Sequence, residues 1–335
     1  MDSLVHQPGF ASLFGVLGCI FCAATVSAAT AALEIGTDDG TLSVRSGPVA
    51  LVTYQARPMT GPVGGARFRG SAFLHPLRTP SGFVVTDLQP GDHLHHFGAW
   101  WPWKYLAVGG RRVLFWELQR GEGIIVGEGV TASGADETGA RFTARNVYLD
   151  RTVEGAPLKL LDETVGIRVS PVTNTPARGY TIDLRITHRC AVNEPIQIVK
   201  YRYSGFGFRG TAAWSSTNST LLTSEGRNRE DSNGSRGRWV RLQGKAGAET
   251  SAGVLLMSDA ANHEHPEFLR TWNSKMHAGA FFVNFNPVQR EAWTFEPGRD
   301  YIRRYRLFVY DGEISAEQAE AQWAAWQTGD RKEMD

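Results

Sequence analysis

Apolar and polar residues alternate in short segments from about residue 33 to the end of the chain, and glycine, proline, asparagine and aspartate interrupt these segments. The clearest example is residues 180–188, where Tyr180, Ile182, Leu184 and Ile186 alternate with polar side chains. Strict alternation predicts an antiparallel strand with one face buried and the other in water. We therefore expect an all-β fold of antiparallel sheets. The other expected strands are residues 42–52, 141–149, 160–169, 238–242, 253–257, 280–285 and 304–310.

One short helix is expected near the C-terminus. Ser315 can cap it and Gln318 can complete a capping box, while Ala319, Trp323 and Trp326 fall on one helical face. A length of 335 residues does not require two domains, because all-β sandwiches often exceed 200 residues. We expect residues 33–330 to form a single β-sandwich domain that ends in this helix.

The N-terminal segment resembles a secretory signal. Residues 10–26 are mostly apolar and lead into the small residues Val26-Ser27-Ala28-Ala29, which predicts a signal peptide over residues 1–28 and an extracytoplasmic (periplasmic or secreted) mature protein. Two alternatives stay open. A retained membrane anchor is one, because no Lys or Arg precedes the apolar run, and lipidation at Cys19 is the other. No later apolar stretch approaches the roughly 20 residues that cross a bilayer.

The charge is balanced, with 35 basic and 34 acidic side chains and a net charge of +1. Such a chain has no electrostatic footprint for nucleic acid or for an anionic membrane surface. Cys190 is the one cysteine beyond the N-terminal apolar stretch, so no disulfide framework is expected. A neutral or polar small molecule is the expected partner.

The segment Asp-His-Leu-His-His at residues 92–96 is the densest group of titratable side chains. In an extended segment alternate side chains share a face, so we expect His93 and His95 to point together and His96 to face the other way. Imidazole titrates near neutral pH and hydrogen-bonds hydroxyls. His93, His95 and His96 are therefore candidate catalytic proton donors, although any of them could instead be a hydrogen-bonded core residue.

Acid–base catalysis needs a second group of different protonation state. Glu225 is the candidate proton acceptor; its alternative role is a solvated partner of Arg227 or Arg229. These segments would have to fold around one cavity. The further candidates for substrate binding are His75, Arg209, Asn262, His265 and Arg270, of which the arginines can hold a carboxylate, keto or hydroxyl group bidentately.

Ten tryptophans and an aromatic share of 11% suggest a site where sugar rings stack. Aromatic faces pack against the apolar C–H patches of a pyranose while polar groups orient its hydroxyls. Trp100, Trp101 and Trp103 follow the histidines directly and are the candidates for this contact. The alternative is that tryptophans fill the core of the sandwich, which we expect for Trp116, Trp293, Trp323 and Trp326.

A metal site is the alternative use of the histidines. His93 with His95 and His263 with His265 form two His-x-His pairs, and four imidazoles could hold zinc or copper. No Glu-x-x-His or Cys-x-x-Cys pattern supports such a site, and no Gly-rich nucleotide loop or Gly-x-Ser-x-Gly elbow is present. We expect no metal and no other cofactor.

Several of these segments together resemble the PmoA-like family of uncharacterised secreted proteins, over about residues 70–325. The resemblance implies an extracytoplasmic β-supersandwich similar to galactose mutarotase-like proteins, which are often thought to act in carbohydrate breakdown. This sequence has Phe97 and Asp259 where the family usually has Arg and His, which leaves an anion-clamping role there without support. The segments that carry the resemblance are His-Pro-Leu at 75–77, Thr-Pro-Ser-Gly at 79–82, residues 92–96, Phe-Trp-Glu at 115–117, residues 203–210 and 223–226, Asn262 with 265–267 and Arg270, and Tyr-Arg at 305–306 before Asp-Gly at 311–312.

The sequence thus predicts an extracytoplasmic carbohydrate-active enzyme, an epimerase, lyase or hydrolase that needs no cofactor and acts on a sugar or oligosaccharide. No nucleic-acid partner is expected, and no membrane contact beyond the N-terminal segment. One alternative is a non-catalytic glycan-binding sandwich. The other is a His-ligated metal-dependent oxygenase or hydrolase, as the label "methane oxygenase" used for the PmoA-like family suggests, although the copper subunits of that enzyme span the membrane several times.

Overall fold

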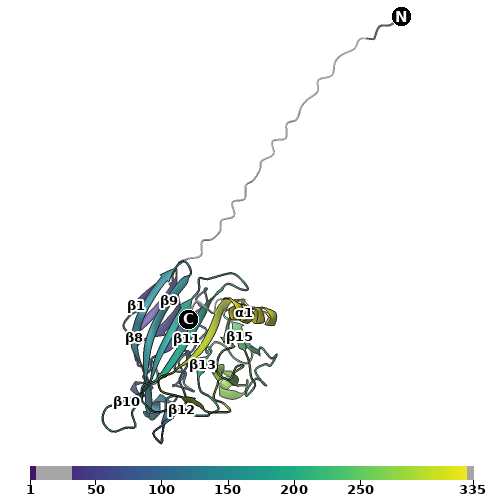
Figure 1. The fold of residues 1–335 in the computed structure, drawn as a ribbon. Helices are drawn as coiled ribbons and strands as arrows, with labels where there is room; N and C mark the ends of the chain where they lie inside the picture. Colours follow the sequence, from purple (N-terminus) through teal and green to yellow (C-terminus); the bar gives the residue numbers. More distant parts are fainter. Residues whose placement is uncertain (5–31, 330–335) are drawn as a thin grey trace.

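The computed structural model describes residues 1–4 and 32–329. Most of the predicted signal segment lies outside these ranges. The described chain forms two large antiparallel sheets and one small one, and a single α-helix lies beside β15 (Trp239–Lys245) (Figure 1). The prediction of an all-β fold with antiparallel sheets and one C-terminal helix is confirmed.

The first large sheet contains eight strands and carries the strands nearest to the histidine segment. Its strands come from the N-terminal third of the chain and from residues 206–286. Their order across the sheet is β1 (Leu33–Asp38), β2 (Thr41–Ser46), β3 (Val49–Gln55), β4 (Phe73–Leu77), β5 (Ala99–Trp100), β13 (Phe206–Arg209), β18 (Phe282–Asn286) and β17 (Phe268–Thr271).

The second large sheet also has eight strands, and the clearest strand of the sequence pattern, residues 180–188, lies in it as part of β11. Its order is β14 (Ser219–Thr223), β15, β16 (Ser251–Ser258), β20 (Asp300–Asp311), β11 (Gly179–Cys190), β10 (Leu158–Val169), β9 (Gly139–Asp150) and β8 (Gly123–Asp136). A smaller sheet has the order β19 (Trp293–Phe295), β12 (Ile196–Ile198), β6 (Tyr105–Val108) and β7 (Arg111–Leu114).

The core lies between the two large sheets. Val44 and Val52 of the first sheet belong to the same buried cluster as Ile182 and Leu184 of the second. Polar side chains also join the sheets, since the Tyr180 hydroxyl donates to the Leu51 carbonyl at 2.9 Å. Alternating strands of two sheets that bury one face each against the other make a β-sandwich.

The helix α1 (Ala316–Thr328) begins as the sequence predicts. The Ser315 hydroxyl accepts the backbone N–H of Gln318 at 3.2 Å, and the Gln318 side chain accepts the N–H of Ser315 at 2.8 Å. Ala319 and Trp326 are buried against Trp239 and other side chains of the second sheet. No helix within residues 1–4 and 32–329 is long and apolar enough to span a bilayer.

Three short 3-10 helices complete the described elements. They are η1 (Ala66–Phe68), η2 (Leu118–Arg120) and η3 (Met276–Gly279). Two of them lie next to the cavity described below, since Glu117 precedes η2 directly and His277 lies within η3.

Candidate active site

A polar cavity of about 340 Å³ lies beside the first sheet, which contributes Arg270 of β17 and Phe282 of β18 to its lining. Its wall comes from residues 93–96, 116–117, 202–203 and 270–282, which are far apart in the sequence. The volume falls in the range of small-molecule sites. The histidine segment and Arg270 therefore do reach one cavity, as the sequence analysis required.

The histidine segment forms tight turns between β4 and β5. The backbone N–H of His93 donates to the Pro90 carbonyl at 2.8 Å, and that of His96 donates to the His93 carbonyl at 2.9 Å. Gly98 then has a φ of 63°, and a Cβ there would lie 2.4 Å from the Leu74 carbonyl oxygen, so only glycine fits. The run is not extended, and the two-residue alternation that we applied to it does not hold.

As a result all three imidazoles meet. The ring centroids of His93 and His96 are 4.7 Å apart, those of His93 and His95 are 5.4 Å apart, and those of His95 and His96 are 5.0 Å apart. The expectation that His96 faces away from the other two is wrong. The turns of this segment bring the three imidazoles to the same side.

His96 is a wall of the cavity. It is 2% exposed and its ring stacks on Phe282 at 4.9 Å and lies 4.8 Å from the ring of Trp100. Burial holds its pKa well below the usual value, with a further contribution from the nearby cationic groups. His96 is thus a neutral imidazole at pH 7.

His95 is neutral for the same reason. Burial lowers its pKa to about 4, although the nearby Glu117 carboxylate opposes this shift. A neutral imidazole both donates and accepts a hydrogen bond, which suits contact with a hydroxyl group.

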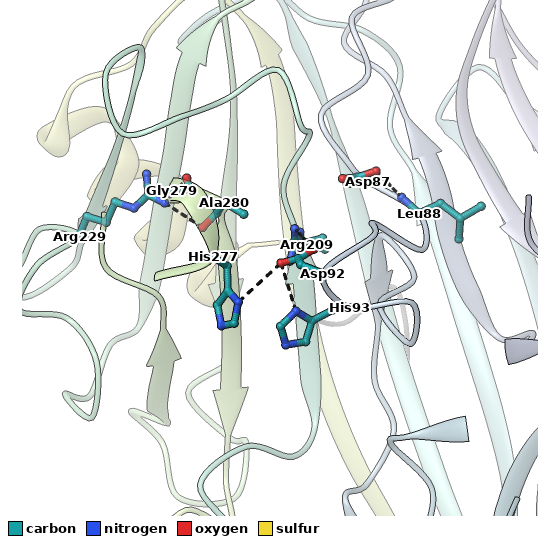
Figure 2. A network of polar contacts seen from close by, with 9 residues as sticks. All are labelled: Asp87, Leu88, Asp92, His93, Arg209, Arg229, His277, Gly279 and Ala280. Carbon is teal, nitrogen blue, oxygen red and sulfur yellow. Dashed lines mark hydrogen bonds and ion pairs between the residues drawn. The ribbon is translucent and has the colours of Figure 1, made fainter. Parts of the chain in front are cut away.

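His93 is oriented by a carboxylate. Asp92 accepts from Nδ1 of His93 at 3.1 Å, and it lies between His93 and His277, whose Nδ1 is 3.8 Å away (Figure 2). Arg209 of β13 holds both oxygens of Asp92, at 2.8 and 3.1 Å. Burial raises the pKa of Asp92, but the hydrogen bonds and charge of Arg209, with a contribution from His93, outweigh burial and leave the pKa below its ordinary value. Asp92 is therefore an anion that holds the imidazole in place.

Arg209 was expected to bind substrate, and here the structure corrects the sequence analysis. Arg209 is 3% exposed, both terminal nitrogens of its guanidinium bind Asp92, and the group lies over the ring of Trp272 at 5.0 Å. It does not line the cavity. Arg209 positions His93 through Asp92.

The loop that carries His277 is fixed by Arg229. His277 and Ala278 both have left-handed backbone conformations, with φ of 48° and 53°. The Arg229 guanidinium donates to the Ala280 carbonyl at 2.8 Å and to the Gly279 carbonyl (Figure 2). Unfavourable backbone conformations of this kind persist where the surrounding structure holds them and are frequent at functional sites.

A second polar group in the cavity consists of Glu117, Tyr203 and Lys104. The Tyr203 hydroxyl donates to Glu117 at 2.6 Å, and the Lys104 ammonium donates to Glu117 and lies 3.0 Å from the Tyr203 oxygen. Burial lowers the pKa of Lys104, although Glu117 opposes the shift. Burial, together with the hydrogen bond to Glu117, raises the pKa of Tyr203, so the phenol stays protonated.

Glu117 and Tyr203 were not singled out as site residues in the sequence analysis. Both lie in segments that carry the family resemblance, Phe-Trp-Glu at 115–117 and residues 203–210. The signal available was a carboxylate placed directly after the apolar residues 113–116.

Two arginines complete the polar lining. Arg270 of β17 donates to the Asn233 side-chain oxygen at 2.9 Å, which is a neutral partner. Arg202 lies near the rings of Tyr201 and Tyr203, at 5.9 and 5.7 Å. Arg270 was among the sequence-predicted binding residues and reaches the cavity; Arg202 was not.

Glu225 lies outside the cavity. Its side chain is 49% exposed and is 3.7 Å from Arg238, which in turn binds Glu320 of α1 at 2.9 Å. The expected partners are occupied elsewhere, Arg227 by Asp231 and Arg229 by the loop at 279–280. The structure therefore does not bring Glu225 to the histidines, and its pairing with them as proton acceptor is withdrawn.

Three further sequence candidates have structural partners away from the cavity. His75 of β4 shares a 2.9 Å hydrogen bond with the Thr86 hydroxyl. The Asn262 amide donates to the Arg304 carbonyl at 2.8 Å. His265 stacks on Trp323 of α1, with ring centroids 6.0 Å apart.

The tryptophans that follow the histidines lie in the core. Trp101 is 1% exposed and donates from its indole nitrogen to the buried Glu163 at 3.0 Å, and Trp103 is fully buried beneath Arg303. Trp100 is 4% exposed and packs in the aromatic cluster behind His96. None of the three lines the cavity; Trp116 and Trp272 do. The expectation that these three tryptophans stack on a sugar is therefore wrong. The chain enters the sandwich at β5 and carries them into the core.

The two His-x-His pairs do not form one metal site, since His263 stacks on Trp293 at 4.1 Å and His265 on Trp323. Among the described residues, two groups place potential ligand atoms within 4.8 Å of one another, and both include His93. They are His93 with His95 and His96, and Asp92 with His93 and His277.

Comparison with solved structures gives distant likenesses. The GH36 alpha-galactosidase AgaB from Geobacillus stearothermophilus is 9% identical with a TM-score of 0.41, and the match covers 86% of this chain and 42% of that one. The Slr1438 protein from Synechocystis sp. PCC 6803 is 9% identical with a TM-score of 0.41, covering 84% and 96%. A GalM/aldose epimerase homologue from C. elegans is 8% identical with a TM-score of 0.35, covering 85% and 100%. Because these TM-scores lie below 0.5, the likenesses carry no argument about function.

No curated protein compared with the sequence matches it. The resemblance to the PmoA-like family stays a prediction, because the model that matches has another description. That model is a family of unknown function, DUF6807, and it matches residues 41–324. The chain belongs to the DUF6807 family.

Proposed function

We propose that this cavity binds a sugar or oligosaccharide and that the protein is a carbohydrate-active enzyme that works by proton transfer. The observation that carries the proposal is the Arg209–Asp92–His93 chain at a cavity that also contains Glu117 and Tyr203. An oriented imidazole and a separate hydroxyl donor in one cavity are the minimum set for acid–base catalysis. Secretion of the protein remains a prediction from residues 1–28.

His93 is the proton acceptor. A neutral imidazole that donates from Nδ1 to Asp92 keeps its Nε2 lone pair for a proton from a sugar hydroxyl or C–H group. The imidazolium that forms is stabilised by the Asp92 anion, which Arg209 keeps in place. His93 is partly exposed, with 22% of its side chain accessible, so substrate can reach it.

Tyr203 is the proton donor. Its one hydroxyl proton, which Glu117 accepts in the free protein, turns to the substrate oxygen and is transferred there, and Lys104, which donates to the phenol oxygen at 3.0 Å, replaces that proton. Burial lowers the pKa of Lys104, which makes the ammonium a better acid. Glu117 accepts hydrogen bonds from both groups and holds them together. These roles take the place of those first given to the histidines and Glu225.

The remaining wall suits a sugar. His95 and His96 are neutral and can exchange hydrogen bonds with hydroxyls without a charge of their own. Trp116 and Trp272 also border the cavity, but they are 2% and 4% exposed and leave little ring surface for stacking, so the polar groups make most of the contact with the sugar. Epimerisation, elimination and hydrolysis all use one proton acceptor and one donor of this kind.

The test is turnover of an oligosaccharide panel, neutral and acidic, with product detection by mass spectrometry. We expect the wild type to convert at least one member, and His93→Gln and Tyr203→Phe each to reduce turnover by about 10² to 10⁴-fold at a nearly unchanged melting temperature. His263→Gln is the matched control, because His263 stacks on Trp293 outside the cavity. Binding without turnover across the panel would favour the glycan-binding alternative, and full activity of His93→Gln would contradict the assignment.

A second candidate function is metal-dependent catalysis, as in the third hypothesis from the sequence. The observation that favours it is the proximity of His93, His95 and His96, whose ligand atoms lie within 4.8 Å of one another. Neutral imidazoles are the form that binds metal. Metal analysis of protein purified without chelator decides between the two, since less than stoichiometric zinc, copper or iron argues against this candidate.

A further inference from the structure

We infer that the sugar bound in this cavity carries a carboxylate, as a uronic acid does, and that Arg202 and Arg270 hold this group. The inference rests on the proposed function, because it names the substrate class of the same site. The sequence left a carboxylate, keto or hydroxyl group open as the ligand of Arg270, and the family description names no substrate.

The charge balance of the cavity is the first argument. Glu117, which lines the cavity, is bound by Lys104, and Asp92, which holds His93, is bound by Arg209. In the part of the chain that the structure describes, Arg202 and Arg270 have no carboxylate partner. Two positive charges are therefore left over at a cavity where burial keeps His95 and His96 neutral.

The two arginines also influence one another. Burial lowers the pKa of Arg270, and the like charge of Arg202 lowers it further. Placing two guanidinium groups close enough to repel costs free energy unless an anion lies between them. A ligand carboxylate would remove this repulsion and gain charge-assisted hydrogen bonds.

The shape of the group follows from arginine. A guanidinium is planar and presents its donors as a fork that matches the two oxygens of a carboxylate. Asn233 holds the Arg270 guanidinium at 2.9 Å, so one side of the fork is fixed before ligand arrives. Tyr203 lies beside Arg202 and belongs to the proposed proton-transfer group, so a sugar acid held by the arginines would lie next to that group.

The same charges argue against a metal cation as the resident ligand. Arg202 and Arg270 line the cavity together with the three histidines, and Arg209 lies behind Asp92. A divalent cation at the histidines would face these positive charges with its nearest carboxylate already bound to Arg209. An anion meets attraction from the same groups.

The experiment compares acidic trisaccharides with their uncharged methyl esters. Galacturonate and glucuronate trisaccharides, their methyl esters, and a sulfated trisaccharide that has no carboxylate are titrated into the full chain by calorimetry. We expect at least one uronate to bind roughly tenfold or more tightly than its methyl ester, with an affinity that falls as salt is added. Arg270→Gln and Arg202→Gln should each remove most of this difference.

Arg290→Gln is the matched control, because Arg290 lies over the Phe268 ring at 5.4 Å and does not line the cavity. Arg202 is exposed, so Arg202→Gln keeps the test valid if Arg270→Gln fails to fold. Equal affinity for acids and esters, or binding of the sulfated sugar alone, overturns the carboxylate inference and leaves the sugar proposal standing. If no trisaccharide binds, charged or neutral, the proposed function fails as well.

Discussion

The pair His93 and His95 and the pair His263 and His265 have the same spacing in the sequence, but they lie in different surroundings. The first two rings are 5.4 Å apart and face one cavity. The other two stack on separate tryptophans, His263 on Trp293 and His265 on Trp323. Equal spacing in the sequence therefore does not determine whether two histidines meet, because the backbone conformation between them sets where their side chains lie.

The residue between the two histidines explains the second pair. Glu264 has a left-handed conformation with a φ of 62°, and Arg236 holds both its carbonyl oxygen and its carboxylate, at 2.9 and 2.8 Å. The chain reverses direction there, so His263 and His265 reach different neighbours. In the first segment consecutive turns gather the rings instead. A His-x-His motif thus becomes a site only where the local turn brings both side chains together and charged groups surround them.

The largest expected effect comes from the carboxylate that orients the first pair. Asp92→Asn removes the anion that binds Nδ1 of His93 and lets the imidazole adopt the other tautomer, so turnover of a converted oligosaccharide should fall by about 10² to 10⁴-fold. Glu264→Gln is the equivalent change beside the second pair and should leave turnover within about twofold, since Glu264 binds the exposed Arg236. An equal loss of turnover in Asp92→Asn and Glu264→Gln would contradict the assignment of the catalytic site to the cavity.

Stability gives the next largest difference between the pairs. His96→Ala opens a hole beneath Phe282 and Trp100 and should lower the free energy of unfolding by roughly 2–4 kcal/mol. His265→Ala removes a ring that lies 6.0 Å from that of Trp323 and should cost about 1 kcal/mol or less. Urea unfolding of both variants measures this. A smaller loss of free energy of unfolding in His96→Ala than in His265→Ala would mean that the His96 imidazole is not part of the cavity wall.

The pH dependence of stability tests the neutral state of His95. Its folded pKa is about 4, below the ordinary value of 6.5, so the unfolded chain binds more protons in between. Stability should therefore fall as pH decreases from about 6.5 to about 4, and by about 1–3 kcal/mol for this group. His75 adds a parallel loss, since burial also lowers its pKa to about 4. His95→Gln lacks this titrating group, so its free energy of unfolding should fall less between about pH 6.5 and about pH 4 than that of the wild type. Urea unfolding at several pH values measures this, and the same pH dependence in both proteins would contradict the assignment.

The sequence predicts the fold well because its signals are local. Alternation over residues 180–188 depends only on which face of a strand is buried, and the capping box of Ser315 and Gln318 depends on residues three apart. Both appear in the structure. The candidate site depends on side chains that meet across the first sheet, and the sequence predicted only part of it, namely the histidines and Arg270.

The errors in the site have physical causes. Trp101 and Trp103 follow the histidines in sequence, but β5 carries the chain directly into the core, where Glu163 and Arg303 take up their polar edges and faces. Glu225 has the chemistry of a catalytic acid but lies at the exposed end of the second sheet, near Arg238. Glu117 is also a carboxylate, but its partners are distant in the sequence. Lys104 and Tyr203 contact it only in the folded protein, so the local sequence could not identify it as a site residue.

The smallest expected effect therefore belongs to Glu225. Glu225→Gln removes one side of a surface pair with Arg238 at 3.7 Å, and such pairs contribute about 0–1 kcal/mol. The free energy of unfolding should change by no more than about 0.5 kcal/mol, and turnover should stay within about twofold of the wild type. Glu117→Gln in the same assays should instead reduce turnover by roughly 10²-fold or more, because the neutral amide releases Lys104 and Tyr203 from their shared anion. A large loss of turnover in Glu225→Gln, with Glu117→Gln unaffected, would place the catalytic site near Glu225 beside the second sheet and not in the cavity that contains Glu117.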